Sequence, residues 1–170
     1  MTGSSSTTDD LRAAREEIFA SAFVVAQHLT RRVDAELVGL GLTAHQWLLL
    51  AILVRSFDGH SPSLTEAAER YGSSRQNVKQ IALGLERRGW VRLVPDPADA
   101  RTTRLQATDK VAVFASPEME RRAAAMLDDV TAGLSRDQVL ALRDLIRPWL
   151  AALTGAGIGR PSANDEESRP

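Results

Sequence analysis

The segment Leu64–Thr108 constrains the fold more than any other part of the chain, because two short helical patterns, a turn and a basic hairpin follow one another there. Its first apolar residues recur at the i, i+3, i+4 and i+7 spacing of one buried helix face, at Leu64, Ala67, Ala68 and Tyr71. Ser63 and Glu66 match a capping box, and Gly72 stands where a helix can end in the left-handed conformation. The pattern predicts a short helix that stops at Gly72.

A second helix is predicted just after this turn, with Ser74 as its N-cap. Its apolar stripe consists of Val78, Ile81, Ala82 and Leu85. The remaining faces carry amide and basic side chains, namely Arg75, Gln76, Asn77, Lys79, Gln80 and Arg87. Such side chains can bond guanine O6/N7 or adenine N6/N7 in a major groove. Two helices joined in this way predict a helix-turn-helix that binds DNA through Ser74 and these side chains. The alternative is an ordinary solvated helix face.

A basic hairpin is predicted after the second helix. Two short strands, Trp90–Val94 and Thr103–Ala107, alternate in polarity and enclose a loop rich in Pro and Asp. Between Ser73 and Arg104 there are seven basic residues against three acidic ones, in a chain whose net charge is −1. We therefore interpret the hairpin as a wing whose DNA-binding residues are Asp99, Arg101 and Arg104. Arg101 suits a narrow minor groove, Asp99 orients this arginine, and Arg104 neutralises a phosphate. The alternative is a solvated hairpin with weak surface ion pairs.

The rest of the chain favours helix. With 44% hydrophobic and 25% charged residues, the chain is predicted to form one domain over residues 9–154, with the winged helix-turn-helix at about 42–108. Flanking helices are expected over 11–39 and 110–153, because both regions carry long apolar stripes. Residues 110–130 are expected to form either one helix kinked at Pro117 or a helix restarted by Ser116 and Pro117. A last helix is predicted after them, with Ser135 and Gln138 as its capping box. The polar segments 1–8 and 155–170 are predicted to be disordered tails.

Several classes of function are disfavoured. The chain has no cysteine, its three histidines are scattered, and it lacks the motifs of phosphate-binding loops, zinc proteases and serine hydrolases. We therefore expect no enzyme activity, no cofactor and no metal site. The longest apolar run, Trp47–Val54, is too short to cross a bilayer, and no signal peptide is recognisable. A cytoplasmic protein without a membrane partner is expected.

The chain resembles the multiple-antibiotic-resistance regulator (MarR) family of bacterial transcription factors. Matching motifs are Leu42-Thr43 with Gln46-Trp47, Leu85-Glu-Arg-Arg-Gly-Trp-Val91, and Asp96-Pro-x-Asp99-x-Arg101. The resemblance spans about residues 11–153 and implies a mainly α fold with a small β-wing, in which a winged helix-turn-helix is flanked by N- and C-terminal dimerisation helices. It further implies a homodimeric repressor that binds a pseudo-palindromic site in double-stranded DNA.

The resemblance also implies a small aromatic or anionic effector that releases the DNA. Candidate pocket residues are Phe19, Phe23, His45, Trp47 and Arg55, although the three aromatic residues also suit an ordinary core. The alternative for the whole chain is a winged helix that contacts other proteins without specific DNA binding. A module of that kind is expected to expose acidic or apolar side chains on its second helix.

Overall fold

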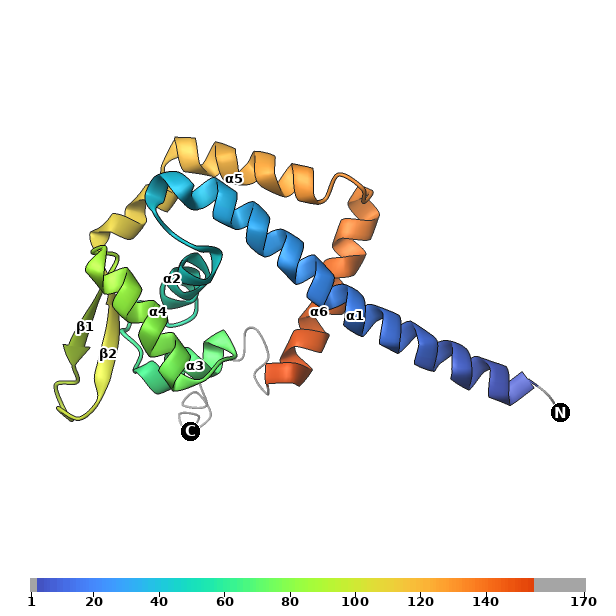
Figure 1. Ribbon diagram of the computed structural model, residues 1–170, viewed down its shortest axis with the longest axis horizontal. Helices are drawn as coiled ribbons and strands as arrows, with labels where there is room; N and C mark the ends of the chain where they lie inside the picture. Colours follow the sequence, from blue (N-terminus) through green and yellow to red (C-terminus); the bar gives the residue numbers. More distant parts are fainter. Residues whose placement is uncertain (1–2, 155–170) are drawn as a thin grey trace, which may run out of the picture. The chain divides into compact units, whose positions relative to one another are not determined.

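Helix α1 (Gly3–Leu37) opens the computed structural model, which describes residues 3–154 (Figure 1). The disorder predicted for the first eight residues is wrong for residues 3–8, which are helical. Once a helix exists, each added residue gains one backbone hydrogen bond, so a polar segment can extend it despite its composition. The disordered tail predicted for 155–170 lies outside the described residues.

The chain divides into two compact units, residues 1–48 and 49–170. In the first unit, α1 leads into the short 3-10 helix η1 (Val38–Leu40), which ends at Gly41 with a left-handed φ of 64°. Helix α2 (Ala44–Arg55) begins in this unit. Its predicted capping box is confirmed, because Thr43 Oγ1 accepts from the Gln46 amide at 3.3 Å and Gln46 Oε1 accepts from the Thr43 amide at 3.2 Å.

The carboxylate of Asp34 ties α1 to the start of α2. Its Oδ1 accepts a hydrogen bond from the Ala44 amide at 2.6 Å. A negative charge at a helix N-terminus is stabilised by the unpaired amides there, so this contact favours the turn between the two helices.

The second unit contains the predicted winged helix-turn-helix. Helices α3 (Leu64–Tyr71) and α4 (Arg75–Arg87) pack against each other, and strands β1 (Val91–Pro95) and β2 (Thr103–Ala107) form an antiparallel hairpin. Helix α4 contacts β1, and α3 contacts β2. The largest fully buried side chains in this core are Trp90, Leu49, Leu50, Leu85, Leu105, Val78, Val91 and Pro62. The fold class predicted from the sequence is confirmed here.

The C-terminal region settles the choice between a kinked helix and a restarted one. A 3-10 helix η2 (Asp109–Ala115) precedes α5 (Pro117–Val130), and α6 (Arg136–Thr154) follows. The Ser116 hydroxyl accepts from the Met119 amide at 3.3 Å, while Pro117 occupies the first turn, where no amide donor is needed. The sequence therefore restarts a helix at Ser116.

Helices α1 and α6 expose much of their apolar surface in the single chain. On α1, Phe19 and Phe23 are each 63% exposed and touch each other edge to face with ring centroids 5.1 Å apart. On α6 the predicted stripe is exposed at Val139, Leu142, Ile146, Trp149 and Leu153. Of the helices that the structure describes, no single one is long and apolar enough to cross a membrane; only the bent pair of residues 8–40 with α2 reaches that length and composition.

Candidate nucleic-acid interface

The turn between α3 and α4 is held by local hydrogen bonds at both of its ends. Gly72 has a left-handed φ of 74°, and its amide donates to the Ala68 carbonyl at 3.0 Å. The Ser74 hydroxyl then accepts from the Asn77 amide at 3.2 Å and caps α4. The predicted glycine stop and the predicted N-cap are therefore both confirmed, and they set the direction in which α4 leaves the turn.

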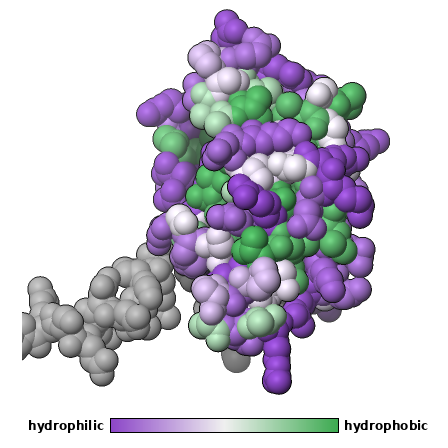
Figure 2. All heavy atoms as spheres, turned by 90° about the vertical axis from the view of Figure 1, so that its left-hand side faces the viewer, coloured by the Kyte–Doolittle hydropathy of each residue, from purple (hydrophilic) through white to green (hydrophobic). Residues whose placement is uncertain are grey.

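Helix α4 has one buried face and one polar exposed face. Val78, Ala82 and Leu85 are completely buried against the unit. The predicted contact residues are exposed, namely Ser74, Arg75, Gln76, Asn77, Lys79, Gln80 and Arg87. Figure 2 views the side of the molecule that carries α4 and the wing, where hydrophilic side chains surround several hydrophobic patches. The arrangement leaves guanidinium, ammonium and amide groups available to a ligand.

Asn77 is engaged in the turn as well as exposed. Its Nδ2 donates to the Ser73 hydroxyl at 2.9 Å, in addition to the cap that its backbone amide makes with Ser74. An Asn reads adenine through one Nδ2 hydrogen and its Oδ1, and because Nδ2 carries two hydrogens, the Ser73 contact leaves both of these groups of Asn77 for a base. Gln76 has the same amide chemistry on the same helical turn.

The wing tip is shaped by Asp99. Its Oδ1 accepts from the backbone amide of Arg101 at 3.0 Å, and its Oδ2 accepts from the Thr102 hydroxyl at 2.9 Å. This is the turn-forming use of an Asp side chain, which fixes the backbone two residues further on. Asp99 thus orients Arg101 through its backbone, while the Arg101 side chain is exposed.

Arg104 lies on β2 opposite Val94, close to the loop of the wing, and is only partly exposed. Its Nε donates to Asp96 Oδ2, its Nη1 donates to the Ser61 carbonyl at 2.8 Å, and the same Nη1 is 3.8 Å from Glu66 Oε2. The amide of Ala98, followed by the Arg104 side chain, lowers the pKa of Asp96. Hydrogen bonds from Ser63 are the main cause that lowers the pKa of Glu66. Both acids are therefore stabilised as carboxylates.

Lys110 is a residue of this unit that sequence reasoning missed. Its Nζ donates to the carbonyl of Arg88, just beyond the end of α4, at 2.9 Å. The same ammonium lies 4.3 Å from the centroid of the buried Trp90 ring. A cation at a helix C-terminus is favourable, so Lys110 stabilises the end of α4. The contact joins residues 22 positions apart, and no local pattern announces it.

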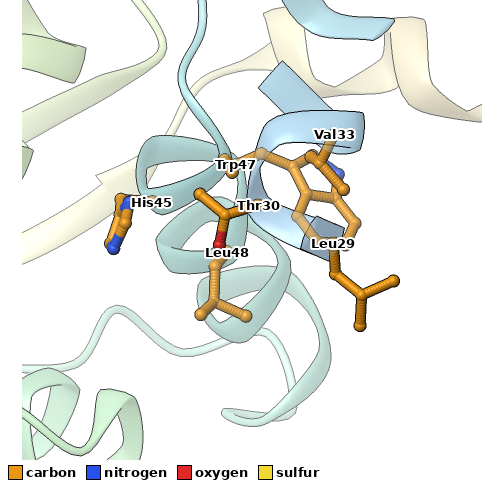
Figure 3. A pocket seen from close by; sticks show the side chains of 7 residues that line it. Leu29, Thr30, Val33, His45, Trp47 and Leu48 are labelled. Carbon is orange, nitrogen blue, oxygen red and sulfur yellow. The ribbon is translucent and has the colours of Figure 1, made fainter. Parts of the chain in front are cut away.

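The predicted effector pocket is only partly assembled. A cavity of about 150 Å³ within residues 29–48 is lined by Leu29, Thr30, Val33, Ala44, His45, Trp47 and Leu48. Figure 3 shows His45, Trp47 and Leu48 of α2 together with Leu29, Thr30 and Val33 of α1. Phe19, Phe23 and Arg55 are not among the lining residues. The core interpretation of Phe19 and Phe23 is wrong for the single chain, because both rings are largely exposed.

Among the described residues, no group of three His, Asp or Glu side chains is arranged to hold a metal ion. The exposed groups of α4 and the wing are instead hydrogen-bond donors and cations, which suit an anionic polymer rather than bond-breaking chemistry.

Comparisons with known proteins agree with this geometry. The sequence model of the MarR family matches residues 40–102. The transcriptional activatory protein BadR of Rhodopseudomonas palustris is 38% identical over 73 residues, which are 43% of this chain and 39% of BadR. The match therefore spans well under half the length of that relative.

Solved structures resemble the chain over a longer stretch. Apo MarR from E. coli matches with a TM-score of 0.62 and 21% identity, covering 77% of this chain and 94% of that one. The reduced form of AbfR, solved bound to DNA, matches with a TM-score of 0.58 and 20% identity, covering 86% and 98%. At these identities, the likeness establishes a common fold.

Proposed function

Because the chain belongs to the MarR family of winged helix-turn-helix transcriptional regulators, whose members are not enzymes, we propose that it binds double-stranded DNA sequence-specifically as a homodimer in the cytoplasm. The observation that carries the proposal is the exposed face of α4. Its N-terminal turn combines Arg75, Gln76 and Asn77 directly after a capped turn, and the same compact unit exposes Arg101 at the wing tip.

Each part of this surface has a separate role in the proposal. Arg75, Gln76, Asn77 and Gln80 read base edges from the major groove. Lys79 and Arg87 neutralise phosphates, which strengthens binding to any sequence. Arg101 enters the minor groove, where a narrow A·T-rich segment offers an enhanced negative potential.

The alternative is a winged helix that contacts other proteins without specific DNA binding. Such a surface is expected to be apolar or acidic, whereas the exposed face of α4 carries basic and amide groups. AbfR, which has the same fold, was solved bound to DNA. Both observations favour DNA as the partner.

The experiment that tests the proposal is selection of genomic fragments by the purified protein, followed by titration of the recovered site at several salt concentrations. We expect a pseudo-palindrome and a log–log salt slope of about −0.9 for each phosphate contacted. Lys79→Gln is expected to reduce the slope by about 0.9 per protomer while it weakens binding to all sequences alike. Gln76→Ala, which removes no charge, is the comparison for Lys79→Gln. It is expected to keep the salt slope and to lose the preference for particular base pairs. Absence of binding at low salt would exclude this function.

Two apolar surfaces support the dimer. The α6 stripe and the aromatic pair of α1 are exposed in the single chain, and apolar patches of this extent usually mark an interface. A twofold dimer carries two copies of α4 and therefore matches a palindromic site with half-sites about one helical turn apart.

Repression with release by a small ligand remains part of the proposal. A dimer bound over a promoter blocks transcription by occupancy alone, whereas BadR is by name an activatory protein. Transcription from the recovered site with purified polymerase therefore decides between repression and activation.

The cavity beside Trp47 suits the ligand. Its volume of about 150 Å³ is the size that accepts a single aromatic ring, and His45 is its one ionisable lining side chain among the described residues.

The ligand proposal predicts that a small phenol or aromatic acid raises the melting temperature of the protein and weakens its binding to the recovered site. Val33→Trp, which fills the cavity, is expected to remove both effects. Ala141→Trp is the matched control, because it introduces the same side chain on α6, outside both the lining residues and the apolar stripe. Equal responses of the wild-type protein and Val33→Trp would show that the ligand binds elsewhere.

A further inference from the structure

We propose that Arg104 is a positioning residue that clamps the wing to α3 and so presents Arg101 to the DNA, and that it is not itself a phosphate contact. This inference rests on the proposed function and revises the role that the sequence alone suggests for Arg104. It follows from where the guanidinium of Arg104 lies and from how many segments it joins.

Three segments that are separate in the sequence meet at Arg104. Asp96 follows the end of β1, Ser61 lies in the loop before α3, and Glu66 belongs to the first turn of α3. Backbone contacts reinforce this meeting point, because the Leu105 amide donates to the Pro62 carbonyl at 2.8 Å and Ser63 forms an isolated antiparallel β-bridge with Arg104. Strand β2 is therefore attached both to α3 and to the loop that precedes it.

The clamp continues from Arg104 to the wing tip. Asp96, whose exposure is only 8%, uses Oδ2 for Arg104 and Oδ1 for the amides of Ala98 and Asp99. Asp99 in turn holds the Arg101 amide, and the Thr102 carbonyl accepts from the Asp96 amide at 2.8 Å. One continuous set of hydrogen bonds thus runs from Ser61, in the loop before α3, to the residue that is proposed to enter the minor groove, and the ion pair with Glu66 adds a contact to α3 itself.

Only an arginine fits these contacts. Nε and Nη1 point at two acceptors in different directions, which the rigid guanidinium fork satisfies simultaneously. A lysine has the same charge on one compact ammonium group and cannot hold both acceptors in this geometry. Two donors of Arg104 and its charge are already engaged by Ser61 and the almost buried carboxylate of Asp96, which makes Arg104 a weaker phosphate ligand than the exposed Arg92 on β1.

The first arm of the test needs no DNA. Hydrogen exchange of the wing amides, those of Arg101 and Thr102 in particular, is measured in the full-length wild-type protein, Arg104→Lys and the control Arg92→Lys. We expect exchange about tenfold faster or more in Arg104→Lys, the size that loss of a charge-assisted hydrogen bond implies, and no change in the control. Asp96→Asn, which removes the same contact from the other side, is expected to match Arg104→Lys. Unchanged exchange in both variants would overturn the clamp.

The second arm measures affinity for the recovered site at fixed salt. If Arg104 is a positioning residue, a lysine at this position does not restore its function. Arg104→Lys and Arg104→Gln are therefore expected to weaken binding by similar factors. Neither is expected to weaken it further in an Arg101→Ala background, because the wing contact is already lost there. A general loss of structure would instead weaken binding in both backgrounds and lower the melting temperature.

A phosphate contact gives the opposite pattern. Arg104→Lys would then keep most of the affinity, and the losses at Arg104 and Arg101 would add. Either result overturns the proposal. If the wild-type protein binds no DNA at all, the proposed function fails together with the presenting role of Arg104, and the exchange arm still decides whether the clamp exists.

Discussion

Ile146→Glu is expected to convert the protein from a dimer to a monomer and to abolish specific DNA binding. Ile146 lies in the exposed apolar stripe of α6 and is 43% exposed in the single chain. Burying a fully exposed side chain of this kind contributes about 1.5–3 kcal/mol. Because less than half of Ile146 remains exposed and a twofold interface contains it twice, its loss costs about 1–3 kcal/mol before the unpaired charge is counted. A monomer holds one half-site only, and affinity is expected to fall by about 10³-fold or more, toward nonspecific binding.

The measurements are sedimentation equilibrium and titration of the recovered site at fixed salt. Ala141→Glu is the matched control, because it introduces the same charge on an exposed face of α6 turned about 120° from the stripe. The control is expected to remain a dimer and to bind as the wild-type protein does. A dimer of normal affinity in Ile146→Glu would show that the α6 stripe serves another purpose.

Trp90→Ala is expected to lower the free energy of unfolding by about 3–5 kcal/mol, the usual cost of deleting a buried aromatic side chain. Trp90 is completely buried, its ring centroid lies 5.6 Å from that of Phe114, and Lys110 covers its face. Its amide donates to the Leu85 carbonyl at 3.0 Å, so the residue joins the end of α4 to the start of the wing. Urea denaturation followed by far-ultraviolet circular dichroism measures the loss.

Trp90→Phe separates packing from hydrogen bonding at this position. Among the described residues, the indole Nε1 of Trp90 is buried without a hydrogen-bond partner. Phenylalanine keeps a ring beside Phe114 and Lys110 and removes that donor, so its cost is expected to be clearly smaller than that of alanine. Equal losses in the two variants would show that the indole donor is satisfied and contributes to stability.

Local signals in the sequence were sufficient for the helix-turn-helix. Ser63, Gly72 and Ser74 act within three or four residues of themselves, through caps and a left-handed turn, so their roles can be predicted without knowledge of the rest of the fold. At Ser116 the local pattern left two alternatives, a kink and a restart, and the structure decided for the restart. The polar face of α4 also follows from periodicity, because a buried stripe fixes which residues remain exposed.

The extent of α1 and the pocket depended on more than local pattern. Residues 3–8 have a polar composition typical of a tail, but they extend a helix that already exists. Phe19 and Phe23 are of a residue type that is common both in cores and in ligand pockets, and residue type alone does not decide between these two locations. The cavity forms where residues 29–33 meet the start of α2, and the turn that brings them together is held by Asp34, a contact across ten residues.

By itself, the sequence of this protein determined the order of its elements, their caps and the exposed face of α4, since each of these depends on interactions between residues a few positions apart. Tertiary structure alone decided what each arginine does. Arg101 and Arg104 are three positions apart and chemically identical, yet one is exposed at the wing tip and the other contacts Asp96, Ser61 and Glu66. The reason is that the partners of a charged side chain are set by which distant segments the fold brings within hydrogen-bond distance, and up to 43 residues separate Arg104 from them.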